Sequence, residues 1–416
     1  PPAALLRLHG SNTIGSELGP ALAEAYLRWK GEDGVHRQLD AAQQKLCVGA
    51  RESSQPTIEI EANGSATAFE DLANHRCEIG MSSRPIKAAE AEAAARRGLG
   101  DLTTLAAEHV IGLDGIAVIV HQNSPLQAID LDQLRRVFSG KSSDLSSLGG
   151  QSGGLHLFAR DDRSGTYDTF KRLVLADEAL SAHAARVTDS RALSDAVARD
   201  PQALGFVGFS YVRGAKAVAV SEAGGPPLYA SAFTVGTEDY ALSRRLYLYL
   251  PVQGPSPAAV DFLSFALSAQ GQSVVRSSGF ADLNVQVIEA RACDARCSPR
   301  YATLTRSARR LSLDFRFRAG KAELDSRGQR DIDRLITFLH QVPDAKLMLL
   351  GFSDARGSYE QNRALSQEYA RKVESELSAR GVHAALVDAL GQEMPISSNT
   401  SDSGRERNRR VEVWLR

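Results

Sequence analysis

Three short turns rich in glycine and hydroxyl residues are the part of the sequence best suited to bind a ligand. Residues 10–13 (Gly-Ser-Asn-Thr), 64–67 (Gly-Ser-Ala-Thr) and 164–166 (Ser-Gly-Thr) each follow a strand pattern and precede a helical one. A helix N-terminus presents unpaired N–H groups, and serine and threonine hydroxyls add donors, so each turn could bind an oxyanion. Such residues more often only cap helices. Three together, with Arg160 before the third, favour one shared anion site.

Alternating strand and helix patterns surround these turns and must position them. Strand patterns occur at residues 6–8, 58–62, 77–81, 115–120 and 155–160, and helical patterns at residues 18–29, 69–72 and 170–173. This alternation predicts an α/β fold with mainly parallel sheets. Ligands of such folds bind at the carboxyl ends of strands, so the three turns could converge on one site.

Length and composition limit the class of protein. The chain has 416 residues, which favours two to four domains at roughly 100–200 residues each. Hydrophobic residues make up 43% and charged residues 24%, which excludes wholesale disorder. The 49 basic and 50 acidic residues nearly balance, so no global basic field indicates a nucleic-acid partner. Residues 306–416 carry 20 basic and 16 acidic residues, and we expect this part to meet a different partner.

The cellular compartment is indicated by the chain start and by the cysteines. No run of about 20 apolar residues predicts a membrane-spanning helix. The chain begins with Pro and not with Met, so we expect it to be processed or trimmed, with any secretion signal already gone. We expect the disulfides Cys47–Cys77 and Cys293–Cys297, which would imply an oxidising compartment. Four separate thiols are the open alternative.

Residues 5–285 resemble the phosphate-binding proteins of bacterial ABC transporters. The matching segments are residues 10–14, 62–65, 78–86, 160–166, 204–208 and 240–247. The resemblance implies a two-lobed periplasmic binding protein of type II at residues 1–285. One lobe would comprise about residues 5–115 plus 225–285 and the other residues 116–224, with the ligand clamped between the lobes.

Position by position, the resemblance also implies the phosphate ligands. The expected phosphate-binding residues are Thr13, Ile14, Ser65, Ser83, Arg84, Arg160, Ser164, Gly165 and Thr166. Thr13 and Ser65 would donate hydroxyls and Ile14 its backbone N–H. Arg160 would supply the formal positive charge, and Asp162 would hold it in place.

One position departs from the pattern of these proteins. Ser83 stands where the family usually has an aspartate that accepts the proton of hydrogen phosphate, and Arg84 follows it. A serine oxygen also accepts a hydrogen bond but does not repel a fully ionised anion. Arg84 would add positive charge if it points inward; an exposed position or a structural ion pair is the open alternative.

The C-terminal quarter reads as a separate small unit. Residues 286–310 break the α/β pattern and are expected to be a linker. Alternating apolar residues at 311–317 predict a half-buried strand, and Asp325 can cap a helix with an apolar stripe. Further strand and helix patterns predict a compact α+β unit at residues 311–416.

This unit resembles the OmpA-like peptidoglycan-binding domain. The resemblance rests on residues 351–357 and on the closing run at residues 404–412. It implies that Asp354 and Asn362 bind the peptidoglycan stem peptide. Tyr369 stands where the family has the arginine that holds the ligand's carboxylate, so Arg405 or Arg409 would have to substitute.

Together the two resemblances imply a periplasmic phosphate-binding protein that performs no chemistry and is held near the peptidoglycan or the outer membrane. The alternatives are an envelope structural or adhesion protein and a phosphate sensor. The expected partners are phosphate or a similar oxyanion, the peptidoglycan stem peptide and an ABC permease, but no nucleic acid. No cofactor is expected, and no metal is expected because residues 293–297 have no nearby histidine. His9 is expected to be a strand residue and not a base.

Overall fold

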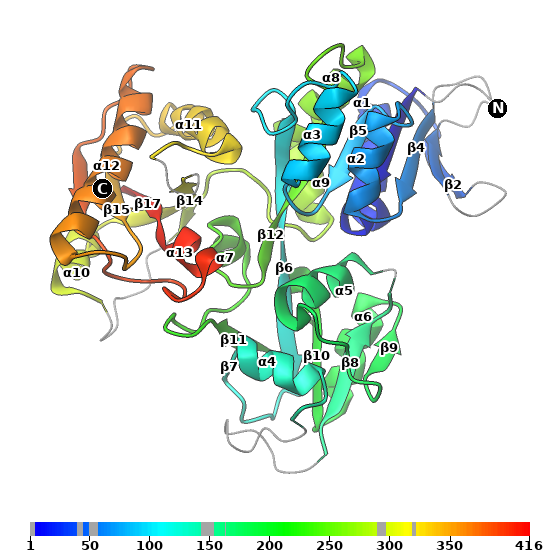
Figure 1. Cartoon of the computed structure of the whole chain (residues 1–416), viewed down its shortest axis with the longest axis horizontal. Coiled ribbons are helices and arrows are strands. Elements are labelled where there is room, and N and C mark those ends of the chain that lie inside the picture. The colour runs from blue at the N-terminus through cyan, green and yellow to red at the C-terminus, as the bar shows by residue number, and fades with distance from the viewer. Residues whose placement is uncertain are drawn as a thin grey trace. The chain divides into compact units, whose positions relative to one another are not determined.

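The computed structural model describes residues 5–39, 45–49, 57–142, 154–162, 164–288, 297–317 and 322–416. The chain forms two compact units, which Figure 1 traces from the N-terminus to the C-terminus. The first unit comprises Pro1–Ser124, Gly154–Lys216 and Ser243–Leu283, and the second comprises Pro125–Gly153, Ala217–Leu242 and Asn284–Arg416. Among the described residues, no helix combines the length and the hydropathy that a membrane span requires.

The first unit is built on strands that follow the order β2-β3-β4-β1-β5-β12-β6-β10-β8-β9 in its described part. Their bounds are β1 (Leu6–Gly10), β2 (His36–Leu39), β3 (Leu46–Gly49), β4 (Thr57–Ala62), β5 (Ile79–Ser82), β6 (Glu108–Val120), β8 (His156–Arg160), β9 (Ala185–Val187), β10 (Ala203–Gly208) and β12 (Ser243–Tyr249). The helices are η1 (Ile14–Leu18), α1 (Gly19–Trp29), α2 (Ser65–Ala73), α3 (Ala88–Arg96), α5 (Gly165–Phe170), η3 (Lys171–Leu175), α6 (Ser190–Arg199), η4 (Phe209–Tyr211), α8 (Pro257–Leu267) and α9 (Ala269–Ser277).

Strand β6 belongs to both lobes of this unit. Its residues 108–115 pair antiparallel with β12, and its residues 116–120 pair antiparallel with β10. Figure 1 shows β6 and β12 running between the two groups of helices. The ladders β1–β4, β1–β5, β8–β10 and β8–β9 are parallel. The α/β prediction is confirmed, but β6 and β12 add antiparallel ladders because they cross between the lobes.

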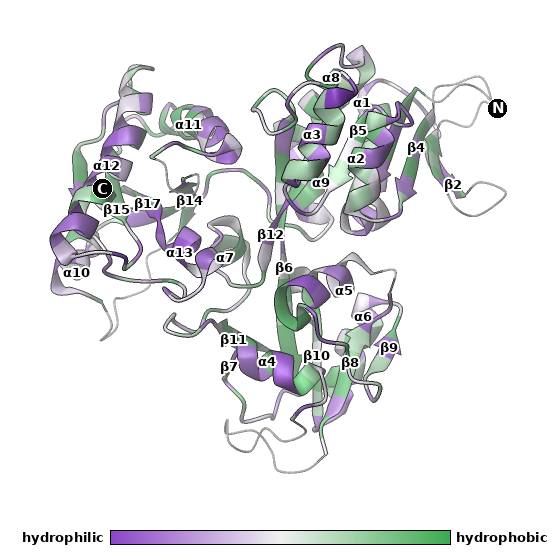
Figure 2. Cartoon of the chain, in the orientation of Figure 1, coloured by the Kyte–Doolittle hydropathy of each residue, from purple (hydrophilic) through white to green (hydrophobic). Residues whose placement is uncertain are grey.

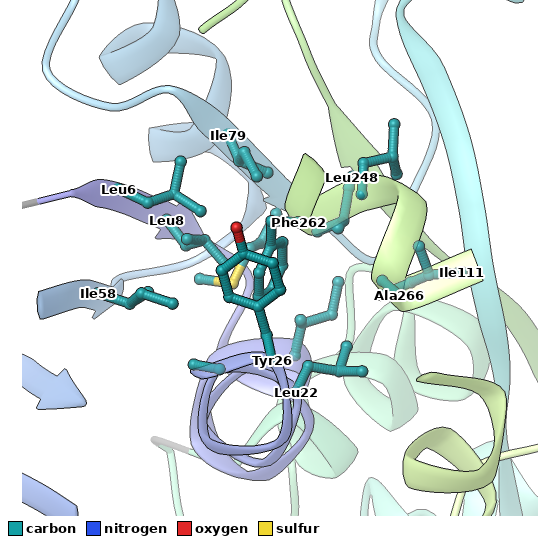
Figure 3. Close-up of a cluster of buried hydrophobic side chains, with 14 of the residues drawn as sticks. Leu6, Leu8, Leu22, Tyr26, Ile58, Ile79, Ile111, Leu248, Phe262 and Ala266 are labelled. Carbon is teal, nitrogen blue, oxygen red and sulfur yellow. The ribbon is translucent and has the colours of Figure 1, made fainter. Parts of the chain in front are cut away.

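The core of the first lobe lies between its strands and the helices α1 and α8. Figure 3 shows the side chains that form it, among them Leu6, Leu8, Ile58, Ile79, Leu22, Tyr26 and Phe262. The Tyr26 and Phe262 rings meet edge to face, with their centroids 5.3 Å apart. This packing fixes β1, and thereby the turn at residues 10–13 that follows it.

The second unit contains a five-stranded sheet in the order β13-β14-β17-β15-β16. Its elements are β13 (Val287–Ile288), α10 (Pro299–Thr305), β14 (Arg309–Arg316), α11 (Ser326–Leu339), β15 (Leu347–Phe352), α12 (Tyr359–Ser378), β16 (Leu386–Ala389), α13 (Asp402–Asn408) and β17 (Arg410–Leu415). β17 pairs antiparallel with both β14 and β15, and β15 pairs parallel with β16. The predicted Asp325 cap of α11 is confirmed, since its side chain accepts a 2.7 Å hydrogen bond from Gly328 N.

Two shorter segments also belong to the second unit. β7 (Ala128–Asp130) pairs parallel with β11 (Lys216–Ser221). α4 (Leu131–Phe138) follows β7 and begins at a capping box, in which Asp130 accepts a 2.8 Å hydrogen bond from Gln133 N. Figure 2 shows both hydrophilic and hydrophobic segments along α4, which has one buried apolar face, whereas β6 is largely hydrophobic.

Buried ion pairs join the chain after α7 (Ala232–Gly236) to strand β14. Asp239 accepts hydrogen bonds from Arg316 Nη2 (2.9 Å) and Arg310 Nη2 (3.2 Å), and Asp314 lies 2.7 Å from Arg310 Nη2. Burial alone would raise the pKa of Asp239, but the two guanidiniums hold its pKa below the usual value. Residues 217–242 belong to the same compact unit as residues 284–416. The resemblance had placed residues 225–242 in the first lobe of the binding protein.

The expected linker at residues 286–310 is in part regular structure, so this prediction is wrong for the described residues 286–288 and 297–310. Strand β13 pairs with β14. Helix α10 begins with Pro299 after the cap residue Ser298. Tyr301 of α10 is buried, donates a 3.0 Å hydrogen bond to Glu412 and lies edge to face with Trp414. Helix α10 is held in place because Tyr301 packs on the sheet.

The predicted Cys47–Cys77 disulfide is wrong, because both residues are thiols. Cys47 lies on β3, and Cys77 lies just before β5. β4 and β1 run between these strands, and three strand spacings of about 4.8 Å exceed the Cα separation of about 7 Å that a disulfide can span. The expected Cys293–Cys297 pair stays a prediction, because Cys293 lies outside the described residues.

We expect Cys47 to react with iodoacetamide faster than Cys77 in the native protein. Cys77 is 5% exposed, whereas Cys47 is only half-buried. Burial raises the pKa of the Cys77 thiol, as do the nearby carboxylates of Asp71 and Glu78, so little thiolate forms. Mass spectrometry of labelled peptides at pH 8 measures both rates. Equal native rates would contradict the burial of Cys77, and equal rates in urea serve as the control.

Candidate functional site

The turns at residues 10–13 and 164–166 lie against each other. Helix α5 starts at Gly165, and a Cβ atom built there would lie 2.1 Å from Thr13 Oγ1 and 2.4 Å from Thr13 Cα. Only glycine permits this contact. Ser164 caps α5, and Ile14 is fully buried in the first turn of η1. The two helix starts therefore present their N–H groups and hydroxyls to the same region.

The third turn reaches this region through Ser83. Gly64 precedes α2 with a φ of 101°, and Ser65 begins the helix. Ser65 Oγ accepts a 3.0 Å hydrogen bond from Ser83 N and lies 3.2 Å from Ser83 Oγ. Ser83 follows β5, so two strand ends of the first lobe contribute hydroxyls at one place.

A buried arginine that the sequence reasoning missed contacts two of the turns directly and the third through Ser83. Arg244 is 6% exposed. Its Nη1 donates to Ser83 Oγ (3.0 Å), and its Nη2 donates to the Gly165 carbonyl (2.7 Å) and to Thr13 Oγ1. The guanidinium therefore lies between the turns at residues 10–13 and 164–166, and Ser83 links it to Ser65 of the turn at residues 64–67. We regard Arg244 as the central cation of the candidate site.

Asp114 holds Arg244 in place. The two residues are register partners on β6 and β12, and Asp114 Oδ2 accepts from Arg244 Nη2 (3.1 Å) and Nε (3.2 Å). Burial raises the pKa of Asp114, and the charge of Arg244 opposes that rise. The available signal was weak: Asp114 is an acidic residue within the long apolar run of β6, and Arg244 is one of two adjacent arginines at the start of β12.

A cavity of about 340 Å³ adjoins this cluster. Five of the expected ligand residues line it, namely Thr13, Arg160, Ser164, Gly165 and Thr166. Asp114, Glu17 and Tyr211 also contribute to its wall, and Tyr211 Oη donates a hydrogen bond to Glu17. The cavity thus combines hydroxyl and guanidinium donors with carboxylate acceptors.

Arg160 is positioned differently from the expectation. Its Nη2 donates to the Thr188 carbonyl (2.9 Å), and its Nη1 donates to Ser190 Oγ. The expected support by Asp162 is wrong, because Asp162 pairs with Arg186 at 2.5 Å. The Nε of Arg160 is buried and has no hydrogen-bond partner among the described residues. That N–H remains available to a ligand.

Arg84 does not contribute an unpaired charge to the site. It forms two hydrogen bonds to the carboxylate of Glu90, at 2.7 and 2.8 Å, and lies 5.3 Å above the Phe69 ring. The structural ion pair left open by the sequence is therefore what the structure shows. Arg172 lies nearby, and desolvation followed by the like charges of Arg244 and Arg84 lowers its pKa.

The second unit brings the expected peptidoglycan residues close to one another only in part. Asp354 pairs with Arg409 at 2.7 Å, and both side chains are nearly buried. Asn362 is buried and donates a hydrogen bond to Gln392. Arg405 points elsewhere and donates to the carbonyls of residues 399 and 400.

Tyr369 lies in the core of the second unit. It is 3% exposed and stacks on Phe317, with ring centroids 4.3 Å apart. A tyrosine at this position serves packing and offers no positive charge. Among the arginines expected to substitute, Arg409 is the one that lies beside Asp354.

The fold and the site define a two-lobed solute-binding protein with a second, α+β unit. The chain belongs to the PBP superfamily, since the model of the PBP superfamily domain matches residues 38–270, more than half of the chain. The OmpA family model matches residues 316–409.

Individual relatives agree with this assignment. The phosphate-binding protein PstS of Bacillus subtilis (strain 168) is 27% identical over 266 residues, which cover 64% of this chain and 83% of that protein. PstS of Pseudomonas aeruginosa (strain PAO1) is 28% identical over 254 residues, covering 56% and 76%. The crystal structure of an ABC-type phosphate transport receptor from Vibrio cholerae superimposes with a TM-score of 0.52 at 18% identity, covering 66% of this chain and 98% of that one. The structural likeness shows the fold.

Proposed function

We propose that the first unit binds hydrogen phosphate and releases it unchanged. The observation that carries this proposal is the buried guanidinium of Arg244, which bonds to Thr13 and Gly165 of two hydroxyl-rich turns and to Ser83, the partner of the third. The proposed ligands are Thr13, Ile14, Ser65, Ser83, Ser164, Gly165, Thr166, Arg160 and Arg244. Charge-assisted hydrogen bonds contribute about 1.5–3 kcal/mol each. A few of them suffice for micromolar binding, which requires about 8 kcal/mol.

The carboxylate of Asp114 supports phosphate over sulfate. Ser83 provides no charge at the usual acceptor position, but Asp114 lines the cavity and accepts a hydrogen bond from Arg244. Hydrogen phosphate carries a proton that a carboxylate can accept, and sulfate at neutral pH carries none. In its ionised form, paired with Arg244, Asp114 would therefore repel sulfate and accept a hydrogen bond from phosphate.

Isothermal titration of the purified full chain with phosphate and with sulfate tests the proposed function. We expect micromolar binding of phosphate and at least about 100-fold weaker binding of sulfate. Small-angle scattering should show compaction on adding phosphate, as expected when a two-lobed protein closes. Equal affinities would end the phosphate-specific proposal, and absence of binding to either anion would end the function itself.

Asp114→Asn is expected to lower the ratio of phosphate to sulfate affinity by at least about 10-fold, because the amide removes the charge and adds a donor. The same titrations measure the ratio. Glu17→Gln is the matched control, since Glu17 lines the same cavity without touching Arg244 in the described structure. An unchanged ratio in Asp114→Asn would assign the discrimination elsewhere.

We further propose that the second unit attaches the protein to peptidoglycan in the periplasm and that the phosphate is delivered to an ABC permease. The proposed contacts are Asp354 with the ammonium group of the stem peptide and Arg409 with its carboxylate. The OmpA family match supports this proposal. Asn362 shapes the site from beneath, because it is 1% exposed.

Asp354→Ala is expected to reduce co-sedimentation with purified sacculi by about 10-fold or more, as expected for loss of a charged hydrogen-bond partner. Asp402→Ala is the control. Asp402 is also an aspartate of the second unit, at the start of α13, but its side chain is 88% exposed. Sedimentation of the two variants to the same extent as the unaltered chain would remove Asp354 from the proposed site.

A further inference from the structure

A histidine and two glutamates on neighbouring strands form a cluster that the anion site does not use. His9 on β1 and Glu61 on β4 are register partners, and Glu59 lies two residues earlier on the same face of β4. His9 Nε2 lies 3.3 Å from Glu61 Oε1 and 3.6 Å from Glu59 Oε1. We propose that these three residues bind a divalent transition-metal ion, with Zn²⁺ as the best fit.

The distances within the cluster suit tetrahedral coordination. Donors about 2.0–2.1 Å from Zn²⁺ are separated by about 3.4 Å when the angle between them is tetrahedral. The histidine nitrogen has this separation from each of the two carboxylate oxygens. The three ligand atoms all lie within 4.8 Å of one another. A metal ion could therefore reach all three without a rearrangement of the strands.

The buried histidine is oriented as a metal ligand. The side chain of His9 is 4% exposed, and its Nε2 has no hydrogen-bond partner among the described residues. His9 Nδ1 lies 2.7 Å from Asp71 Oδ2, and the second oxygen of Asp71 lies 2.5 Å from Arg76. A carboxylate on one ring nitrogen fixes the tautomer that presents a lone pair on the other nitrogen. The nitrogen that carries this lone pair, Nε2, lies within 3.6 Å of an oxygen of each glutamate.

The cluster already attracts a cation. Lys45 Nζ lies 2.9 Å from Glu59 Oε1 and 2.7 Å from Glu61 Oε1. The ammonium thus contacts the same two oxygens that would ligate the metal. Its side chain is 37% exposed, so it can swing into solvent when an ion enters. Lys45 is therefore a competitor whose removal should strengthen metal binding.

The rival interpretation is an ion-pair cluster in which His9 is doubly protonated and no metal binds. The two interpretations differ in the effect of Lys45. An ion-pair cluster loses a stabilising charge when Lys45 is replaced and gains no affinity for metal. A metal site gains affinity, because two glutamates become available to the ion.

Titration of the chelator-treated full chain with ZnCl₂, in buffer without phosphate, tests the proposal. We expect one ion per chain. His9→Asn and the double variant Glu59→Gln/Glu61→Gln should each weaken binding by at least about 10-fold, and Asp71→Asn by about 10–100-fold. Lys45→Met should tighten binding several-fold. Circular dichroism of each variant establishes that the fold is retained.

Two further measurements separate this site from other zinc ligands. Cys47 is the register partner of Glu59 on β3, so the Cys47→Ser variant should keep its zinc affinity if the thiol is not a ligand. Co²⁺ bound at the site should give a tetrahedral visible spectrum without a thiolate charge-transfer band. No zinc binding at 100-fold molar excess, or equal affinities of the His9→Asn, Lys45→Met and unaltered chains, would overturn the proposal.

Discussion

Replacing Arg244 by methionine is expected to weaken phosphate binding by at least about 100-fold. The guanidinium makes charge-assisted contacts to Ser83, Gly165 and Thr13 at the meeting point of the turns. In the proposed complex the guanidinium would also donate two hydrogen bonds to phosphate. Loss of two charge-assisted hydrogen bonds removes about 3 kcal/mol or more of binding free energy, which corresponds to about two orders of magnitude in affinity. Titration calorimetry with phosphate measures the effect.

Two companion variants distinguish lost binding from lost folding. Arg244→Met alone leaves the buried carboxylate of Asp114 without its partner, so the double variant Arg244→Met/Asp114→Asn should fold better and still bind weakly. Arg245→Met is the matched control, because adjacent strand residues point to opposite faces. If Arg244→Met in its folded form bound phosphate as tightly as the unaltered chain, the centre of the proposed site would be misplaced.

Replacing Asp239 by alanine is expected to destabilise the second unit by about 3 kcal/mol or more, as for other buried ion pairs that lose one member. The variant leaves Arg310 and Arg316 with Asp314 as their shared carboxylate, and Arg310 also with Glu412. Urea unfolding followed by Trp414 fluorescence measures the change. A Trp29→Phe background makes the signal specific, because Trp29 and Trp414 are the two tryptophans of the chain.

The effect of Asp239→Ala should depend on pH. The guanidiniums hold the folded pKa of Asp239 below its unfolded value, so its contribution is present above about pH 4 and is lost as the pH falls through the folded pKa. The difference from the unaltered chain should therefore shrink in acid. Asp333→Ala is the control, since that carboxylate is 71% exposed and its pair with Arg380 should contribute under about 1 kcal/mol. Equal effects of the two substitutions would contradict the role of burial.

Neighbouring Asp314 has the opposite dependence. Burial raises its pKa to about 7, despite the attraction of Arg310. A raised folded pKa favours the protonated form, so this group stabilises the fold below its unfolded pKa and loses that contribution as the pH rises toward 7. The network therefore contains two carboxylates whose contributions to stability respond to pH in opposite directions.

The local parts of the candidate site were predictable from the sequence, whereas its centre was not. The turns at residues 10–13 and 164–166 have a local signal, because glycine, serine and threonine mark a helix start. The Asp114–Arg244 pair joins residues 130 positions apart, and no short-range pattern records such a contact. The same holds for Arg160, whose partners Thr188 and Ser190 come from a different segment than its neighbour Asp162.

The wrong predictions about the fold have the same kind of cause, which is a contact between residues far apart in the sequence. The Cys47–Cys77 prediction rests on the even number of cysteines in the chain. The separation of the two residues depends instead on the order of the strands in the sheet. Crossover connections set that order, and the spacing of cysteines along the sequence does not encode it. Residues 286–310 read as a linker because apolar periodicity is weak there. In the structure Tyr301 supplies the packing of this segment against Trp414, which is a contact between distant residues.

The position of β12 has a consequence for how the chain can be divided. β12 lies between β5 and β6 in the first lobe's sheet, although it is encoded after every described strand of the second lobe. A nascent chain leaving the ribosome cannot complete that sheet until residue 249 has emerged, and until then the edges of β5 and β6 remain unpaired and prone to aggregation. Any fragment intended to isolate the first unit must therefore extend to Leu283, and one that stops before Ser243 should be recovered as insoluble material.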